Sequence, residues 1–205
     1  MVALEVLQIE AGQMKNFAYL VFCGETRKAV VVDPSLAPQA VLEVAREHQL
    51  KIVGLLNTHG HQDHIAGNGE ILAAFKMPHW GHPLDLPTAD QQLFEGTEVV
   101  VGKGRIRVMH TPGHTPGSVV LQTGAGLITG DTLFVGRCGR ADLPGSDVDQ
   151  LYESLQRLKG LEHSLKVYPG HDYGARPIST IGDEMVENEF LGAVDRASFI
   201  RLRMT

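Results

Sequence analysis

Short apolar runs that end at glycine, proline or polar residues recur along the chain and predict most of its secondary structure. Runs rich in Val, Ile, Leu and Phe predict β-strands at Leu4–Ile9, Phe17–Phe22, Ala29–Val32, Ile52–Asn57, Glu98–Val101, Ile106–Met109, Val119–Thr123, Leu127–Thr129 and Lys166–Tyr168. Apolar residues at helical spacing predict helices at Gln39–His48, Gly67–Phe75, Asp149–Leu158 and Gly182–Leu191, with another turn or two near Ala197–Leu202.

The order of these elements predicts the class of fold. Strands follow strands and are separated by isolated helices, which favours a layered α/β sandwich over a doubly wound parallel sheet. Pro38 fits the first turn of its helix, and Thr180 and Asp183 have the spacing of a capping box. The chain has 205 residues, a length at which we expect residues 1–205 to form one domain.

Composition limits the kinds of partner. The 18 Lys and Arg against 24 Asp and Glu give a formal charge of −6 without any basic run, so a nucleic-acid partner is not expected. No apolar run approaches the length of a membrane span, and the N-terminus lacks the pattern of a signal peptide. Cys23 and Cys138 do not make a disulfide framework. We therefore expect a reduced cytoplasmic protein, while its oligomeric state stays open.

The stretch from Thr58 to His64 carries the strongest chemical signal. His59, His61, Asp63 and His64 follow the apolar run Ile52–Leu56 directly. Imidazole and carboxylate groups are ligands for zinc, iron and manganese. On a tight turn these side chains point in several directions, as two adjacent cations require, whereas a helix would align only positions i and i+4. The pattern predicts a metal site.

Three later strands end in the same way. Each stops at a Gly or Pro turn that carries a further donor, and these donors are His114, Asp131 and His171. Loops beyond strand ends are where α/β folds hold ligands. Seven donors suit two cations, each with an open position for water. One cation would be held by His59, His61 and His114 and the other by Asp63, His64 and His171, with Asp131 as the bridge.

The order of these motifs resembles the metallo-β-lactamase superfamily. The motifs are His-x-His-x-Asp-His, Thr111–Gly117, Gly130-Asp131-Thr132-Leu133-Phe134 and Tyr168-Pro169-Gly170-His171-Asp172-Tyr173. Within the superfamily the chain is most similar to the branch of glyoxalase II (hydroxyacylglutathione hydrolase) and persulfide dioxygenase. The resemblance implies a four-layer αβ/βα sandwich with the metals in a groove at the edge of its two sheets.

The resemblance also implies a site for the substrate. In the family a basic residue of the segment Gly-Cys-Gly-Lys/Arg and a tyrosine after the last ligand contact glutathione, and Cys138, Arg140 and Tyr173 match these positions. Arg140 would instead serve only as an ion-pair partner if it binds Asp142 or Asp147. Arg137 stands where relatives usually have Gly, which would crowd or recharge the groove.

The chain resembles the shorter form of glyoxalase II. The longer form has a C-terminal helical domain that completes the glutathione site, whereas this chain ends soon after its last predicted helix. Its carrier is therefore glutathione or another thiol of low molecular weight. Either carrier would present carboxylates or amides to Arg140.

The leading functional prediction is hydrolysis of a small-molecule thioester, S-acylglutathione of the S-lactoylglutathione type. A hydroxide held by two divalent ions, zinc or possibly iron or manganese, attacks the carbonyl. Asp63 and Asp131 are the catalytic residues, because Asp63 orients the hydroxide and Asp131 bridges the metals.

The competing prediction is a persulfide dioxygenase with a single Fe(II). By that resemblance its ligands are His59, His114 and Asp131, and its substrate is glutathione persulfide. Gly170 favours the hydrolase, since dioxygenases tend to have Ala there. A third alternative is an inactive metal-binding module, but all seven ligands are present.

Overall fold

The computed structural model describes residues 2–204. Its strands form two six-stranded sheets and one small hairpin. The strands are β1 (Glu5–Glu10), β2 (Phe17–Phe22), β3 (Lys28–Val32), β4 (Lys51–Leu56), β5 (His79–Gly81), β6 (Gln91–Gln92), β7 (Glu98–Val101), β8 (Gly104–His110), β9 (Val119–Gln122), β10 (Gly126–Gly130), β11 (Leu133–Phe134), β12 (Arg137–Cys138), β13 (Lys166–Pro169) and β14 (Ser179–Thr180). The helices are α1 (Pro38–Glu47), α2 (Gln62–Ile65), α3 (Asn68–Ala74), α4 (Val148–Lys159), α5 (Ile181–Glu187) and α6 (Arg196–Met204).

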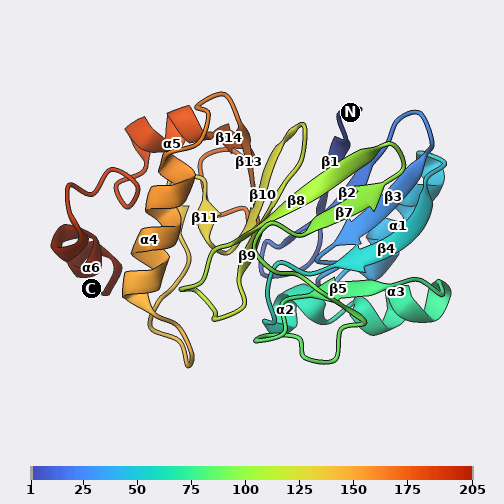
Figure 1. The fold of residues 1–205 in the computed structure, drawn as a ribbon, viewed down its shortest axis with the longest axis horizontal. Coiled ribbons are helices and arrows are strands. Elements are labelled where there is room, and N and C mark those ends of the chain that lie inside the picture. Colours follow the sequence, from blue (N-terminus) through green and yellow to red (C-terminus); the bar gives the residue numbers. More distant parts are fainter. Residues whose placement is uncertain (1, 205) are drawn as a thin grey trace.

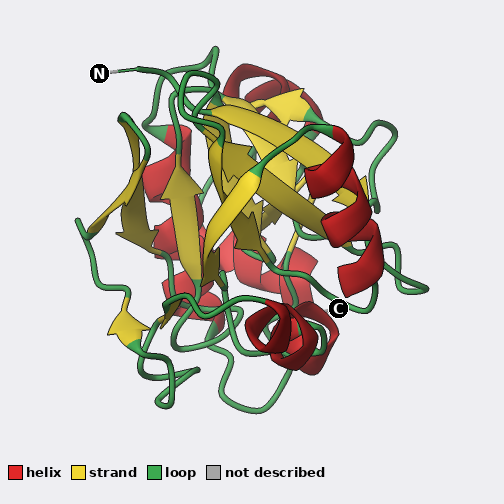
Figure 2. Ribbon diagram, turned by 90° about the vertical axis from the view of Figure 1, so that its right-hand side faces the viewer, coloured by secondary structure: helices red, strands yellow, loops and turns green. Residues whose placement is uncertain are grey.

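The two sheets lie face to face between two layers of helices (Figure 1). The first sheet has the order β1-β2-β3-β4-β5-β6, and the second has the order β14-β13-β10-β9-β8-β7. Helices α1 and α3 cover the outer face of the first sheet, while α4, α5 and α6 lie beyond the second (Figure 1). Figure 2 shows the strands between helices on the near and far sides. The predicted four-layer αβ/βα sandwich is confirmed.

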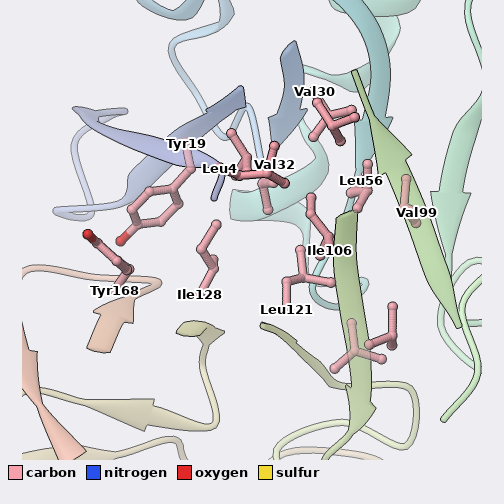
Figure 3. Packing of buried hydrophobic residues seen from close by; sticks show 14 of the residues in the cluster. Leu4, Tyr19, Val30, Val32, Leu56, Val99, Ile106, Leu121, Ile128 and Tyr168 are labelled. Atoms are coloured by element: carbon pink, nitrogen blue, oxygen red, sulfur yellow. The ribbon is translucent and has the colours of Figure 1, made fainter. Parts of the chain in front are cut away.

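Three hydrophobic clusters fill the spaces between these four layers. Strand β2 is buried along its whole length, because its alternate side chains point into two of them. Tyr19 and Val21 join the cluster between the sheets, whereas Leu20 and Phe22 pack towards α1 and α3. Figure 3 shows the cluster between the sheets, where Tyr19 from the first sheet meets Tyr168 and Ile128 from the second. Strand β2 therefore lies in the interior of the first sheet, between β1 and β3.

The predicted strands and helices are confirmed with small shifts at their ends. The helix predicted to run from Gly182 to Leu191 ends at Glu187, because Asn188 leaves the helical conformation and its side chain binds the backbone of the β11–β12 hairpin. The capping box between Thr180 and Asp183 is present, and Pro38 begins α1. The short elements β5, β6, β11, β12, β14 and α2 were not predicted.

One local prediction is wrong. The metal motif was expected to lie wholly on a turn, yet α2 begins directly after His61 and contains Asp63 and His64. The segment still presents its donors in different directions, because His59 and His61 precede the helix and Asp63 and His64 occupy its single turn.

The two sheets meet at the edge where the motif loops emerge. The Val119 amide donates to the Thr58 carbonyl (2.8 Å) and the Phe17 amide to the Gly170 carbonyl (2.8 Å), so each bond joins one sheet to the other. No helix within residues 2–204 is long and apolar enough to cross a membrane.

Helix α4 packs directly on the loop that carries His114. The Asp147 amide donates to the Gly113 carbonyl (2.8 Å), and the Ser154 hydroxyl donates to the Pro112 carbonyl (2.7 Å). Gly113 has φ of +134°, and a Cβ there would lie 2.2 Å from the Leu151 backbone nitrogen. Only glycine permits this approach of loop and helix.

Gly113→Ala should therefore destabilise the protein by at least about 2 kcal/mol, because it combines backbone strain with a clash against α4. Gly69→Ala is the matched control, since a Cβ at Gly69 in α3 meets nothing within 4 Å. We expect that control to be neutral or to stabilise by up to about 1 kcal/mol. Urea unfolding of both variants measures the difference, and equal midpoints would contradict the packing argument.

Candidate metal centre

All seven predicted ligands come together at the shared edge of the sheets. His59, His61, Asp63 and His64 follow β4, and the remaining ligands, His114, Asp131 and His171, follow β8, β10 and β13. His61 and Asp63 are half-buried and the other five are buried. Imidazole and carboxylate groups at this depth need partners, because an unpaired polar group away from water costs free energy.

The ligands divide into the two groups expected from the sequence. Donor atoms of His59, His61 and His114 lie within 4.8 Å of one another, as do those of Asp63, His64 and His171. In the first group His61 Nδ1 lies 2.9 Å from His114 Nε2. In the second, His64 Nε2 lies 3.1 Å from His171 Nε2.

Asp131 lies between the two groups. Its Oδ2 is 3.5 Å from His114 Nε2 in the first group and 3.3 Å from His171 Nε2 in the second. Its Oδ1 is 3.2 Å from His64 Nε2. A carboxylate in this position can offer one oxygen to each of two neighbouring cations.

A buried network around Asp33 fixes two of the rings from behind. His64 Nδ1 donates to Asp33 Oδ2 (3.2 Å), and the Thr58 hydroxyl donates to the same oxygen (2.5 Å). The Thr58 hydroxyl in turn accepts a hydrogen bond from His59 Nδ1 (3.1 Å). Donor atoms of Asp33, His59 and His64 also lie close together. Asp33 orients the two rings through their Nδ1 atoms, directly for His64 and through Thr58 for His59, and so leaves their Nε2 atoms for the other candidate ligands.

Backbone carbonyls fix two more rings. His114 Nδ1 donates to the Arg140 carbonyl (2.9 Å), and His171 Nδ1 donates to the Met14 carbonyl (3.0 Å). Because Nδ1 is bonded to a carbonyl in each case, Nε2 faces the other ligands and offers its lone pair to a cation once it carries no proton. Four of the five imidazoles are thus oriented as metal ligands by their outer nitrogens.

The donor set fits divalent cations. His59 Nε2 and Asp131 Oδ1 are buried and accept or donate no hydrogen bond within the described part of the chain. Both atoms face the other ligands, where a cation would satisfy them. Two groups of nitrogen and oxygen donors around one carboxylate are chemistry suited to zinc, iron or manganese.

The two groups differ in their affinity for protons. Burial lowers the pKa of His59 well below its usual value, helped by the charge of His64, and burial likewise lowers the pKa of His61. Burial opposes charge on His171 too, but its bonds to Asp131 and Asp63 raise its pKa to about 9. His59 and His61 are therefore neutral and ready to bind a cation, while His171 must release a proton to do so.

The carboxylates of the site are held ionised. Burial would raise the pKa of Asp131, but the charge of His64 and a hydrogen bond from His171 hold it well below its usual range. The same balance of burial against His171 and His64 lowers the pKa of Asp63. Asn16 contributes there by donating to Asp63 Oδ2 (2.9 Å).

Three residues that support the site were missed from sequence. Asp33 follows β3 at a Pro turn, the same signal that identified the other donors, so it could have been found. Asn16 and Asp85 gave no such signal. Asp85 ties the two motif loops together, because it accepts from the Gly60 amide (3.0 Å), the Gly117 amide (2.7 Å) and the Thr115 hydroxyl.

A groove of about 190 Å³ opens onto the candidate ligands, and Arg140 and Tyr173 are among the residues that line it. The Tyr173 ring stacks on the His171 ring with centroids 4.6 Å apart. Arg140 reaches the groove while forming a two-bond ion pair with Asp142; Asp147 instead caps α4.

Cys138 does not line the metal groove. Its thiol is buried, and burial raises its pKa to about 12. Cys23 is a buried free thiol as well. Cys138 lies in β12 and lines a neighbouring hollow of about 180 Å³, so its contact with a substrate stays a prediction.

Comparison with known proteins divides between the two predicted activities. Over 178 residues the chain is 39% identical to a hydroxyacylglutathione hydrolase of Rhodospirillum rubrum, covering 84% of this chain and 68% of that one. It is 32% identical to the mitochondrial persulfide dioxygenase ETHE1 of Bos taurus, covering 84% and 70%.

The crystal structure of ETHE1 from Myxococcus xanthus superimposes with a TM-score of 0.92 at 32% identity, covering 98% of this chain and 90% of that one. Residues 11–171, which include all seven candidate ligands, match the metallo-beta-lactamase superfamily. The chain belongs to the metallo-beta-lactamase superfamily.

Proposed function

We propose that this protein is a two-metal hydrolase that cleaves a thioester, with S-acylglutathione of the S-lactoylglutathione type as the substrate class. The position of Asp131, within 3.5 Å of imidazole nitrogens from both ligand groups, is the observation that carries this proposal. A site for one cation would not need a carboxylate shared between two complete groups. The likeness to hydroxyacylglutathione hydrolase points to the same class of reaction.

Two divalent cations, when bound, polarise a carbonyl oxygen and lower the pKa of a water ligand towards about 7. His59, His61 and His114 would hold one of them, and Asp63, His64 and His171 would hold the other. Asn16 fixes the Asp63 carboxylate through its bond to Oδ2, so this carboxylate keeps one orientation while the substrate binds. Positioning of this kind lowers the barrier, because the reacting groups need not be ordered again during the reaction.

The bond changes of the reaction take place in the groove that Tyr173 lines. A water molecule gives up one proton to the bulk solvent as its oxygen bonds to the carbonyl carbon. The C–S bond breaks, and the products are the carboxylic acid and a thiolate. Because thiols have pKa values near 8.5, the leaving sulfur needs no general acid. Burial raises the pKa of Tyr173, so its hydroxyl stays protonated and can donate a hydrogen bond to the substrate.

Persulfide dioxygenase is the second candidate, favoured by the structural likeness to ETHE1. It would use one iron on His59, His114 and Asp131. The other four donors would then bond to one another, as the His64–His171 contact already allows.

The lack of a side chain at Gly170 helps to distinguish the hydrolase from the dioxygenase. A Cβ at Gly170 would lie 2.2 Å from Asp131 Oδ1 and 3.0 Å from His64 Cε1. Alanine there would push the Asp131 carboxylate away from the second group. Glycine at this position leaves Asp131 free to face both groups, which supports the two-metal proposal.

Metal content should be measured first, on protein purified without added metal. We expect about two divalent ions per chain together with hydrolysis of S-lactoylglutathione. About one iron per chain, with oxygen uptake on glutathione persulfide and no thioester cleavage, would instead establish the dioxygenase.

Two ligand variants separate the candidates further. Asp131→Asn should lower either activity at least about 100-fold, because it removes the charged ligand common to both. His171→Ala should lower hydrolysis by a similar factor but spare much of a one-iron dioxygenase. His163→Ala, in an exposed loop, is the control and should behave as wild type. Full hydrolysis in His171→Ala would overturn the two-metal proposal.

Gly170→Ala tests the space beside Asp131. We expect the metal content to fall from about two to about one ion per chain, because the second cation should bind about 10- to 100-fold more weakly. Gly69→Ala serves as the control, since a Cβ added at residue 69 would meet no atom within 4 Å. Elemental analysis and the hydrolysis assay measure the effect. If the variant keeps both ions and full turnover, residue 170 does not govern the second site.

A further inference from the structure

We propose that His79 is a positioning residue of the metal centre. Its Nε2–H group fixes the orientation of the Asn57 amide, and that amide holds the Asp33 carboxylate behind His64. The inference rests on the metal centre of the proposed function, and it applies to either candidate reaction. His79 would act through the two intermediate side chains and not by contact with a cation.

Three segments of the first sheet and its helices bring these side chains together. Asn57 directly follows β4, His79 begins β5 and Asn68 begins α3, three elements that lie side by side in Figure 1. Strands β4 and β5 are parallel, with Leu55 opposite His79, and Leu55 packs towards α1 and α3. Because alternate residues of a strand share a face, Asn57 points to the same side as Leu55 and meets His79 there. Both polar side chains are buried.

The Asn57 amide uses its whole capacity for hydrogen bonds. Its Oδ1 accepts from His79 Nε2 (2.7 Å) and from Asn68 Nδ2 (2.7 Å). Its Nδ2 donates to Asp33 Oδ1 (3.2 Å) and to Asn68 Oδ1 (3.3 Å). An amide side chain offers two donors and two acceptor lone pairs, so all of them are engaged. In a buried place the amide keeps this orientation, because an unpaired polar group there costs free energy.

Only two of these partners determine which way the amide faces. Asn68 offers both an NH₂ group and an oxygen, so the two amides could exchange nitrogen and oxygen together and keep their mutual bonds. Asp33 only accepts, since its carboxylate also receives the amide and the hydroxyl of Thr58. The Asn57 nitrogen must therefore face Asp33 and its oxygen must face His79. It follows that His79 Nε2 carries a proton.

The His79 donor supports the group behind His64. Burial lowers the pKa of His79, so its ring is neutral near about pH 7.5 and one nitrogen alone carries the proton. Without this donor the Asn57 amide would be oriented by Asp33 alone, which is the group that the amide supports. The carboxylate could then turn away from His64 Nδ1, which lies 3.2 Å from its Oδ2. Loss of a partner behind a metal ligand lowers metal affinity, typically about 10- to 100-fold.

The protonated nitrogen of His79 can be observed in the unmodified protein. Nitrogen-15 NMR of the ring nitrogens at about pH 7.5 should show the proton on Nε2. His79→Gln identifies the signals by their loss. A proton on Nδ1 instead would overturn the inference, because Nε2 could then not donate to the Asn57 oxygen.

Zinc affinity tests the positioning role. The full chain is freed of metal and titrated with Zn²⁺ in competition with a chelator. His79→Leu removes the donor and should weaken binding of at least one of two ions about 10-fold. His79→Gln restores an N–H donor and should bind within about 3-fold of wild type. Equal losses in the two variants, or no loss in His79→Leu, would contradict the role, and His163→Leu in an exposed loop is the control.

A double-mutant cycle shows whether the effect passes through Asn57. In Asn57→Ala the connection to Asp33 is already cut, so adding His79→Leu should weaken zinc binding less than about 2-fold further. A loss of about 10-fold in both backgrounds would mean that His79 acts independently of Asn57, and it would overturn the inference. If either variant does not fold, the protonated nitrogen in the unmodified protein still decides.

None of these measurements requires turnover, so they succeed or fail independently of thioester hydrolysis. Zinc affinity that depends on the His79 donor in a protein that cleaves no thioester would leave the positioning role assigned and remove only the proposed reaction. Thioester hydrolysis with zinc affinity that is the same in wild type and His79→Leu would do the reverse.

Discussion

The carboxylate of Asp33 holds the most crowded part of this molecule in place. It is buried and accepts from His64 Nδ1, the Thr58 hydroxyl and the Thr58 amide. Asp33 itself has φ of +46°, a conformation that Asp tolerates better than most residues. Through Thr58 it also sets the His59 ring. Four of the five converging imidazoles have their outer nitrogens satisfied, and without Asp33 two of these four would lose their orientation.

The site also depends on the packing of the sheets. Its ligands come from β4 in the first sheet and from β8, β10 and β13 in the second. Neither sheet alone presents a complete group, because His114 joins His59 and His61 while His171 joins Asp63 and His64. Cations that bind both sheets should therefore stabilise the folded state over the unfolded chain. Asp85 also stabilises the folded state, because it joins the loops of Gly60 and Gly117.

Much of this arrangement could be predicted, and the limits have physical causes. Strands such as β2 and β7 were predicted to the residue, because apolar runs bounded by turn residues are a local signal. All seven candidate ligands are brought together in the structure. The two-residue strands β6, β11, β12 and β14 could not be predicted, because they are too short to show the alternation of apolar and polar residues that identifies a strand. Asp85 owes its hydrogen-bond partners to contacts across the fold, which no local pattern reveals.

The two candidate activities differ in how many of the same donors bind metal. A hydrolase needs both groups occupied, whereas a dioxygenase needs His59, His114 and Asp131 alone. Asp131 can serve either arrangement, and the space left by Gly170 decides whether its Oδ1 can face the second group. The choice between the two candidate reactions would thus be set by the space around the Asp131 carboxylate, and not by the identity of the donors that surround it.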